Sequence, residues 1–541
     1  MPPRARVPLG SLLLLGAPLA FLALFFAFPL LITFREAASG SAWEWAFTHP
    51  YVRSRLVIAL EQAFLSLAFA LALTVPLALL HHRRRIPFAR WHLALHAAPF
   101  VLPVFVVVYG LEATLGRGGW TEAAFGVDVL AVVGPLGAVA LANAYYNYGL
   151  LARLLHAALE RRPHRLEAAA RTLGASRFEA FRRVSLPLLA PAIAAACLLA
   201  FLFSFTSFGV VLFLGAGEVS TLETLLYENM GGAFPRLDRA AVLGLVQLGL
   251  NLLLLAGYGL LRRREARIPR DPVPVAAPAR PRHVAAAWAS LAVPLLPALA
   301  VLVGAVHVGG AWTLEPVRAV LDPAHPSHVG GFDVLHAVGL SLIYAGAAVL
   351  LSLLLAALLA YGLRSLGEWP RRLVEGAAAL PLGTSSLLVG FGATLAFGAG
   401  ALLDLRGSLA LVVAAHTLLA FPFTARAVLP ALAAHDRRLD EAAAVLGAPP
   451  SHVVFRVHWP LFRAPLVVAA GMAAAISLGD FGASLVLMQS DTMSLSLWIG
   501  HHGGFDPLRR AQASALAALL MLITLAAYLV AEAFRKEDPL A

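Results

Sequence analysis

The chain has 541 residues, of which 60% are hydrophobic and 13% are charged, and its mean hydropathy is +0.80. A soluble domain carries about 25% charged residues, so this composition excludes an ordinary soluble enzyme or binding domain and indicates a membrane protein. The net charge of +11 comes from arginines gathered in short segments between apolar runs. That pattern is typical of membrane topology and of contact with anionic membrane lipids, not of nucleic-acid binding.

Apolar runs of roughly 20 residues, each long enough to cross about 30 Å of hydrocarbon, recur along the whole chain. The first run is longer than the apolar core of a signal peptide, which is about 7–15 residues, so we expect it to be an uncleaved span. The sequence therefore predicts an all-α polytopic membrane protein of about twelve transmembrane helices. We place them at 10–34, 56–80, 93–115, 129–151, 187–215, 240–261, 284–307, 334–362, 373–399, 408–430, 460–488 and 512–534.

Arginine-rich segments follow the even-numbered spans or precede the odd-numbered ones, as at Arg83–Arg85 and Arg262–Arg264. Because basic segments stay on the cytoplasmic side, we expect both termini to be cytoplasmic. The segment 262–283 is also rich in proline, which disfavours a continuous helix. It predicts a cytoplasmic linker between a first six-span unit, 1–261, and a second six-span unit, 284–541.

A short cassette occurs once in each half, in the basic loops at about 160–187 and 433–460. The separation along the chain between Gly174 and Gly447 equals that between Pro187 and Pro460. The alanines before each glycine favour helix, and each glycine suits a helix end or a tight turn. The cassette therefore predicts a helix-turn-helix elbow that projects from the bilayer. The alternative is a solvated connector whose arginines only follow the topology.

The halves also match outside the cassette. Residues 204–209 align with 477–482 at the same separation as the cassettes, and Tyr109-Gly110 aligns with Phe391-Gly392 at a slightly larger one. A loop shortened by nine residues between the two matches accounts for the change. Since each repeat has an even number of spans, the repeats should run parallel, related by an axis along the membrane normal.

These features resemble the permease subunits of binding-protein-dependent ABC importers. In that family the motif Glu-Ala-Ala, three residues, Gly, nine residues, Ile-x-Leu-Pro forms coupling helices that dock into ATP-binding subunits. The second copy matches from Glu441, whereas the first has Ala168 at the position of the glutamate and Glu167 one place earlier. The resemblance implies the type I importer fold and these coupling residues: Glu167, Ala169, Ala170, Gly174, Pro187, Asp440, Glu441, Ala442, Ala443, Gly447 and Pro460.

The only lysine, Lys536, does not lie in a glycine loop, so the phosphate-binding motif of P-loop ATPases is absent from the sequence. We therefore expect a transport subunit and not an enzyme. The resemblance implies a homodimeric ABC ATPase that holds ATP and Mg²⁺, one ATPase subunit per elbow, and an extracytoplasmic solute-binding protein. It also implies one copy of this chain per complex, no cofactor on the chain itself, and a prokaryotic inner or plasma membrane.

Two fused units are similar to the thiamine and ferric-iron permeases, and we rank these two substrates nearly equal. Polar residues inside spans usually face a cavity or another helix. Asp480 could contact a cationic substrate or cap a helix break, and we predict no metal site, because adjacent histidines point in different directions and no carboxylate cluster accompanies them. The predicted translocation-path residues are Asn143, Ser204, Ser207, His416, Ser477 and Asp480.

Two other classes remain open. An ion-coupled secondary transporter would also have two six-span repeats, but it has no need of two matched elbows. An intramembrane enzyme would need a nucleophile with its base, or a metal cluster, inside the spans.

Overall fold

The computed structural model describes residues 9–160, 163–231, 233–265, 277–322, 324–325, 333–398, 404–433, 437–449, 452–489, 491–502 and 507–534. Residues 266–276, which make up the middle of the predicted linker 262–283, lie outside this part, as do the first eight and last seven residues. The described part is helical except for short loops and four two-residue strands. The predicted all-α fold is confirmed.

Ten helices of the described part are long and apolar enough to cross a membrane, and two bent helix pairs bring the number to twelve if each pair is one span. The bent pairs are Ala89–Val101 with Val104–Phe125, bent by 105°, and Glu368–Gly383 with Ser386–Phe397, bent by 100°. They occupy the predicted spans 93–115 and 373–399, and the structure adds a sharp bend inside each of them. The single helices are Leu13–Glu36, Pro50–His82, Val129–Glu160, Arg177–Phe205, Leu237–Glu265, Pro281–Gly304, Val334–Leu363, Leu409–Leu432, Phe455–Gly479 and Leu508–Phe534.

Each bend has a local cause. In the first pair Leu102 is extended, with ψ 142°, because it precedes Pro103, whose ring disfavours a helical conformation in the residue before it. In the second pair Thr384 is extended, with ψ 136°, and the Ser385 side chain accepts a hydrogen bond from the Leu388 amide at 3.2 Å. Ser385 is thus an N-cap that starts a new helix inside an apolar run.

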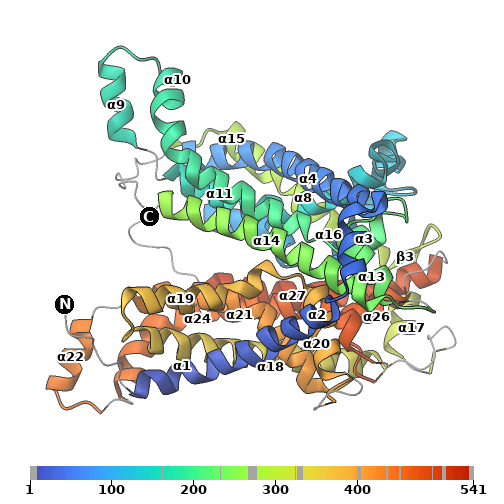
Figure 1. Cartoon of the computed structure of the whole chain (residues 1–541). Coiled ribbons are helices and arrows are strands. Elements are labelled where there is room, and N and C mark those ends of the chain that lie inside the picture. The colour runs from blue at the N-terminus through green and yellow to red at the C-terminus, as the bar shows by residue number, and fades with distance from the viewer. Residues whose placement is uncertain are drawn as a thin grey trace. The chain divides into compact units, whose positions relative to one another are not determined.

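The helices form two compact units. The first unit contains residues 1–35, 321–501 and 519–540. Its helix α18 packs against α21 and α24, and α1 packs along α18 (Figure 1). Its elements are α1 Leu9–Leu22, η1 Ala23–Ala27, α2 Phe28–Glu36, α18 Val334–Leu363, α19 Glu368–Ala379, η4 Leu380–Gly383, α20 Ser386–Phe397, α21 Leu409–Ala433, α22 Arg437–Val445, η5 Val453–His458, α24 Trp459–Gly479, α25 Gly482–Leu487, α26 Leu495–His502 and the later part of α27 Pro507–Phe534.

The second unit contains residues 36–320 and 502–518. Here α4 packs against α8, and Phe201 and Phe205 of α11 pack against Ala59 and Ala63 of α4. Its elements are α3 Gly40–Thr48, α4 Pro50–Arg83, β1 Arg84–Arg85, α5 Ala89–Ala97, η2 Ala98–Val101, α6 Val104–Leu115, α7 Trp120–Phe125, α8 Val129–Glu160, α9 His164–Thr172, α10 Arg177–Ala180, η3 Phe181–Ser185, α11 Leu186–Phe205, α12 Gly209–Leu214, α13 Leu222–Met230, α14 Leu237–Glu265, β2 Ala277–Pro278, α15 Pro281–Ser290, α16 Ala292–Gly304, β3 His307–Val308, β4 Ala311–Trp312 and α17 Glu315–Leu321. Strand β1 pairs with β2 in parallel, and β3 pairs with β4 antiparallel.

The compact units are not the two sequence halves, because each half gives its first span to the unit built mainly from the other half. In the first unit, a Cβ added to Gly392 would lie 3.4 Å from Pro29 Cβ of α2. In the second unit, a Cβ added to Gly110 would lie 2.6 Å from the Pro297 carbonyl oxygen of α16. Gly110 and Gly392 are the matched glycines of the two repeats. In each unit, therefore, the matched glycine packs against a proline of the exchanged span.

This exchange predicts that the chain needs no covalent linker. We expect residues 1–270 and 271–541, coexpressed as two chains, to copurify and to retain most of the transport activity. The reason is that α1 contacts α18, and α16 contacts α6, whether or not the peptide chain between them is cut. Affinity purification through a tag on either fragment measures the association. Fragments that separate in mild detergent would contradict the prediction.

Candidate functional site

The first elbow is built from α9, a turn at Gly174, and α10, and it projects beyond the ends of the long helices of its unit (Figure 1). Gly174 has φ +93°, and the Ala175 amide donates to the Ala170 carbonyl at 3.1 Å. This is a glycine-terminated helix end, in which a left-handed residue lets the last carbonyls find partners. Ser176 then caps α10 in a capping box with Glu179.

The second elbow repeats this geometry. Gly447 follows α22 with φ +75°, and the Ala448 amide donates to the Ala443 carbonyl at 3.0 Å. In both copies a π-helical turn, η3 or η5, leads into the helix that carries Pro187 or Pro460. The prediction that the two glycines end helices is confirmed. The π-helical turns have no sequence signal that we recognised.

The first acidic residue of each cassette bonds inside its own elbow. In the first elbow, Ser185 Oγ donates to Glu167 Oε1. At the equivalent positions of the second elbow, His458 Nε2 donates to Asp440 Oδ1 at 2.8 Å. Each carboxylate therefore ties the first elbow helix to the turn that enters the membrane helix, and Glu167 and Asp440 hold equivalent places.

Further side chains fasten the second elbow to α18. Tyr361 Oη and His458 Nδ1 are hydrogen-bonded, and Arg364 Nη2 donates to Asp440 Oδ2 at 3.3 Å. His458 thus bonds through both ring nitrogens, through Nε2 to Asp440 and through Nδ1 to Tyr361. Glu441, the neighbouring carboxylate, is exposed. The elbow thus has one acidic side chain turned inward and one facing solvent.

A double-mutant cycle tests the inward bond. We expect Asp440→Ala and His458→Ala to destabilise the protein by less together than the sum of the two single effects, with a coupling energy of about 1–3 kcal/mol. The reason is that either single change leaves the partner without its half-buried hydrogen bond. Thermal unfolding of the purified variants measures the coupling. Glu441→Ala is the control, for which we expect a change within about 0.5 kcal/mol.

Each elbow carries an exposed leucine directly before its glycine. Leu173 is 89% exposed and Leu446 is 86% exposed. A second pair in register, Leu166 and Leu439, is 53% and 46% exposed. Burying one leucine side chain is worth about 1.5–3 kcal/mol, so two matched apolar tips beside small alanines form a surface suited to another protein. Sequence reasoning did not single out these leucines, although an apolar residue at the same place in two polar loops was a visible signal.

Inside the second compact unit, a buried polar cluster joins three helices. Asn143 Nδ2 donates to Gln62 Oε1 at 3.0 Å, and Gln62 Nε2 donates to the Ser204 carbonyl at 2.6 Å. Asn147 Nδ2 donates to Ser204 Oγ at 3.1 Å and to the Asn143 carbonyl at 2.9 Å. Of the predicted path residues, Asn143 and Ser204 therefore lie together, linked through Gln62 and Asn147.

The equivalent place in the other unit holds His416 and Ser477, which align with Asn143 and Ser204 at the separation of the two cassettes. His416 Nδ1 accepts from Ser477 Oγ at 2.8 Å, and His416 Nε2 donates to Ser484 Oγ at 3.1 Å. Asp480 accepts from the amide and the hydroxyl of Ser484, both at 2.9 Å, and so caps α25. Of the two readings open for Asp480, its bonds match the helix cap. A contact between Asp480 and the substrate stays a prediction.

A small pocket of about 230 Å³ opens beside the first of these clusters. Asn143 and Ser207 line it, whereas Ser204 is buried and does not. The side-chain oxygen of Asn147, another lining residue, has no hydrogen-bond partner among the described residues although Asn147 is 3% exposed. The pocket walls include the aromatic side chains Phe100, Tyr146 and Phe203. The pocket therefore combines aromatic faces with polar side chains, which suits a flat ring that carries hydrogen-bonding groups.

Among the described residues, no group of three or more His, Cys, Asp or Glu side chains is placed to hold a metal ion. The buried histidines of the second compact unit bond to one another and to neighbours instead. His81 Nε2 and His92 Nδ1 are 2.8 Å apart, and His92 Nε2 donates to the Ala287 carbonyl at 2.7 Å. These contacts make His92 part of the attachment of α15.

The two matched elbows, the matched polar clusters and the helical spans define a duplicated transport permease. The model of the family "Binding-protein-dependent transport system inner membrane component" matches the chain twice, at residues 75–267 and 348–537. The chain belongs to this family, and its two repeats fit the type I importer permease fold. It is a multi-pass membrane protein of a prokaryotic permease family.

Individual relatives agree with this assignment. The chain is 28% identical to the thiamine transport system permease protein ThiP of Brucella abortus (strain 2308) over 551 aligned residues, covering 96% of this chain and 95% of that one. It is 27% identical to ThiP of Salmonella typhimurium over 508 residues, covering 90% and 89% of the two chains. The sulfate transport system permease protein CysT of Escherichia coli (strain K12) is 31% identical over 271 residues, which are 48% of this chain and 96% of CysT. This alignment thus covers almost all of CysT and about half of this chain.

Proposed function

We propose that this chain forms the translocation path of an ATP-driven importer for thiamine. The substrate follows from relatives named as thiamine permeases that cover almost the full length of the chain. An external binding protein would deliver thiamine, and two identical ATPase subunits would supply the energy, one at each elbow. The two repeats, 1–261 and 284–541, would each contribute one elbow, with both termini in the cytoplasm.

The matched exposed leucines carry the coupling part of this proposal. Leu173 and Leu446 lie at the same register of two equivalent elbows, beside the positions Ala169, Ala170, Ala442 and Ala443. Two matched surfaces suit two identical partners. Closure of the ATPase pair on ATP would move the elbows and open the path to alternate sides. In this account Glu167 and Asp440 keep each elbow rigid, while Glu441 remains available for a partner contact.

The pocket beside Asn147 supports thiamine over ferric iron. Thiamine carries an aminopyrimidine ring, which would bond to polar side chains of the lining such as Asn147 and Ser207 while Phe100 or Phe203 contacts the ring face. A ferric ion would instead need clustered oxygen or nitrogen ligands. Iron remains the second candidate, because the fused permease architecture does not itself choose the cargo.

Calorimetric titration of the partner binding protein with thiamine, and separately with a chelated ferric salt, tests the substrate. We expect tight binding of thiamine only, followed by ATP-dependent thiamine uptake in vesicles that contain the whole complex. Ferric binding with iron uptake would overturn the substrate assignment. Uptake that follows an ion gradient and needs no ATPase would favour the secondary transporter.

Asn147→Leu tests the pocket without touching the elbows. We expect uptake to fall by about tenfold, because one hydrogen bond contributes about 0.5–1.5 kcal/mol and the larger apolar side chain also narrows the pocket. ATPase association should be unchanged. Asn251→Leu is the matched control, since Asn251 is a buried asparagine of the same unit whose side chain has no partner among the described residues and does not line the pocket. Equal uptake by the two variants would contradict a role for the pocket.

A further inference from the structure

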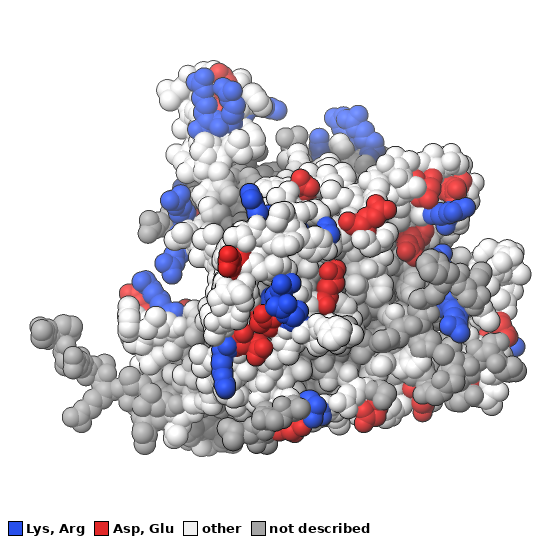
Figure 2. Space-filling view, turned by 45° about the vertical axis from the view of Figure 1, so that its right-hand side comes forward, with Lys and Arg blue, Asp and Glu red and all other residues white. Residues whose placement is uncertain are grey.

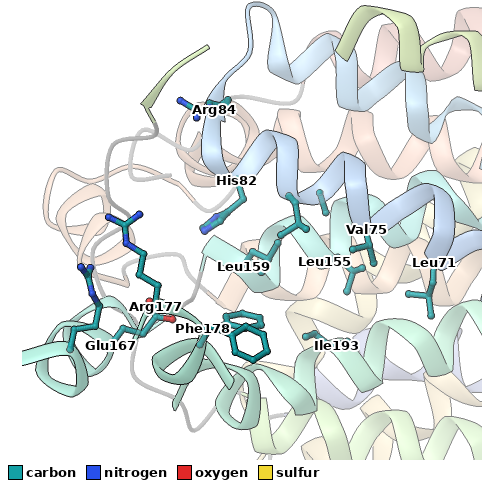
Figure 3. Close-up of a pocket in the computed structure, with 14 residues that line it drawn as sticks. Leu71, Val75, His82, Arg84, Leu155, Leu159, Glu167, Arg177, Phe178 and Ile193 are labelled. Carbon is teal, nitrogen blue, oxygen red and sulfur yellow. The ribbon is translucent and has the colours of Figure 1, made fainter. Parts of the chain in front are cut away.

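A larger groove of about 920 Å³ lies in the second compact unit, between the first elbow and helices α4, α8 and α11. Figure 3 shows its two ends: Leu71, Val75 and Leu155 lie along the helices, while Arg84, Arg177 and Glu167 lie at the opposite end. The volume falls in the range of about 300–1,000 Å³ that is usual for ligand sites. The groove therefore has an apolar part and a charged mouth.

The depth of the apolar part corresponds to one leaflet of a bilayer. Leu71 and His82 both line the groove, and His82 ends the candidate span Pro50–His82. The eleven residue steps from Leu71 to His82 rise by about 16 Å along α4, and half of the hydrocarbon core is about 15 Å thick. Val75 is 41% exposed and so is available to a chain that lies in the groove. The apolar surface thus begins where the span ends and continues to the middle of the bilayer.

The mouth is positively charged. Arg84, Arg171 and Arg177 line it, and Glu167 is the one carboxylate among the described lining residues. Glu167 accepts the hydrogen bond from Ser185 Oγ, so part of its bonding capacity is used inside the elbow. Within the described part of the chain, none of the three arginines forms a salt bridge. Figure 2 shows the same excess of basic side chains, in blue, on the projecting elbow.

We propose that this groove binds an anionic phospholipid from the leaflet on the side of the elbows. One acyl chain would lie against Val75, Leu155 and Ile193, and the phosphate would pair with Arg84, Arg171 and Arg177. Guanidinium groups bind phosphate by two parallel hydrogen bonds, and basic pockets between membrane helices at a bilayer surface suit anionic headgroups. A neutral lipid would leave the excess of positive charge at the mouth unpaired.

The site belongs to the first elbow alone. The positions equivalent to Arg84, Arg171 and Arg177 in the second repeat are Leu366, Ala444 and Pro450. Arg171 is on α9 and Arg177 begins α10, so a bound headgroup contacts both helices of one elbow. The lipid would therefore brace the first elbow, in a chain whose second elbow is held instead by Arg364 and Asp440.

Lipid retention by the purified full-length chain tests this proposal. The probes are phosphatidylglycerol and phosphatidylcholine with the same acyl chains, and native mass spectrometry counts the lipids that stay bound. We expect one phosphatidylglycerol to be retained, and its apparent affinity to fall roughly 100-fold in the triple variant Arg84→Gln, Arg171→Gln, Arg177→Gln, because each basic residue contributes about fivefold. Phosphatidylcholine should bind weakly to both proteins.

The matched control is the triple variant Arg165→Gln, Arg182→Gln, Arg183→Gln, which removes the same number of charges at and next to the first elbow, outside the lining of the groove. It should retain phosphatidylglycerol as the original chain does. Equal losses in the two triple variants, or no loss in the first, would overturn the proposal. If the first triple variant does not fold, the three single substitutions decide the question, each with an expected loss of about fivefold.

Two further arms separate a lipid from a free phosphate. Val75→Trp fills the apolar part and leaves the arginines in place, so it should lower phosphatidylglycerol retention at least tenfold, in line with loss of the acyl contact. Free glycerol 3-phosphate at the same concentration should not displace the lipid. Unchanged retention by Val75→Trp, or full displacement by glycerol 3-phosphate, would show a headgroup site only and would overturn the phospholipid assignment. None of these measurements depends on the ATPase or on thiamine.

Discussion

Replacing Leu173 and Leu446 together with aspartate is expected to abolish copurification with the ATPase and to reduce ATP-dependent uptake at least 100-fold. Each leucine buried at a partner surface contributes about 1.5–3 kcal/mol, so the loss of two amounts to about 3–6 kcal/mol before the cost of burying a carboxylate. That is a factor of more than about 100. The free chain should fold as before, because the two side chains are 89% and 86% exposed.

The measurement is affinity purification of the coexpressed complex in mild detergent, followed by uptake in vesicles. Leu173→Asp and Leu446→Asp alone should each weaken the complex while leaving one elbow engaged. The control is Phe234→Asp with Leu314→Asp, since both residues are exposed and lie outside the elbows. An ATPase that stays bound to the elbow variant, at the level of the control, would rule out docking through these leucines.

Gly149→Ala is expected to have the largest effect on folding. A Cβ at this position would lie 1.8 Å from the His96 carbonyl oxygen and 2.7 Å from Ala97 Cα, which are backbone atoms of α5. Helix α8 or α5 would have to move, and Tyr148 would lose its 3.1 Å hydrogen bond with His96. Overpacking of this kind costs about 1–3 kcal/mol or more.

Thermal unfolding of the detergent-purified chain measures this effect, with the yield of monodisperse protein as a second readout. Gly249→Ala is the control, because no atom lies within 4 Å of a Cβ added to Gly249 in α14. On helix propensity alone, alanine stabilises a helix by about 0.8–1 kcal/mol relative to glycine. We therefore expect opposite signs for the two substitutions. A stabilised Gly149→Ala would mean that α5 and α8 are not in close contact.

The sequence was sufficient to predict the spans and the elbows, because both depend on local properties. Hydropathy over about 20 residues indicates a span wherever its partners lie, and a glycine after a run of alanines indicates a helix end. Hydropathy cannot show whether the helix axis changes direction inside a span. The sequence stays apolar through the 105° bend between Val101 and Val104. Only Pro99 and Pro103 indicated a break there, and many membrane helices contain proline.

The candidate path was harder to predict, because its residues meet only in three dimensions. Asn143 and His416 were selected as polar residues inside spans, and both lie in buried polar clusters. Gln62 and Asn147, which complete the first cluster, were also visible as polar residues inside spans. The same signal marks many polar residues that only pack against a neighbouring backbone. The side-chain bonds of Asn143 and Asn147 go to Gln62 of α4 and Ser204 of α11. The sequence of α8 alone does not show these bonds, so it cannot show which asparagine oxygen is left without a partner.

The exchange of first spans also sets an order of events during synthesis. Helix α1 is made first, but α18, against which it packs, begins only at Val334, in the second half of the chain. At about 5–20 residues per second, α1 waits roughly 15–60 seconds in the bilayer before its partner is made. The face of α1 that later contacts α18, where Leu15 packs against Gly362, is exposed to lipid or to an insertion factor during that interval. The N-terminal helix must therefore be stable in the membrane by itself, and its docking is among the last steps of assembly.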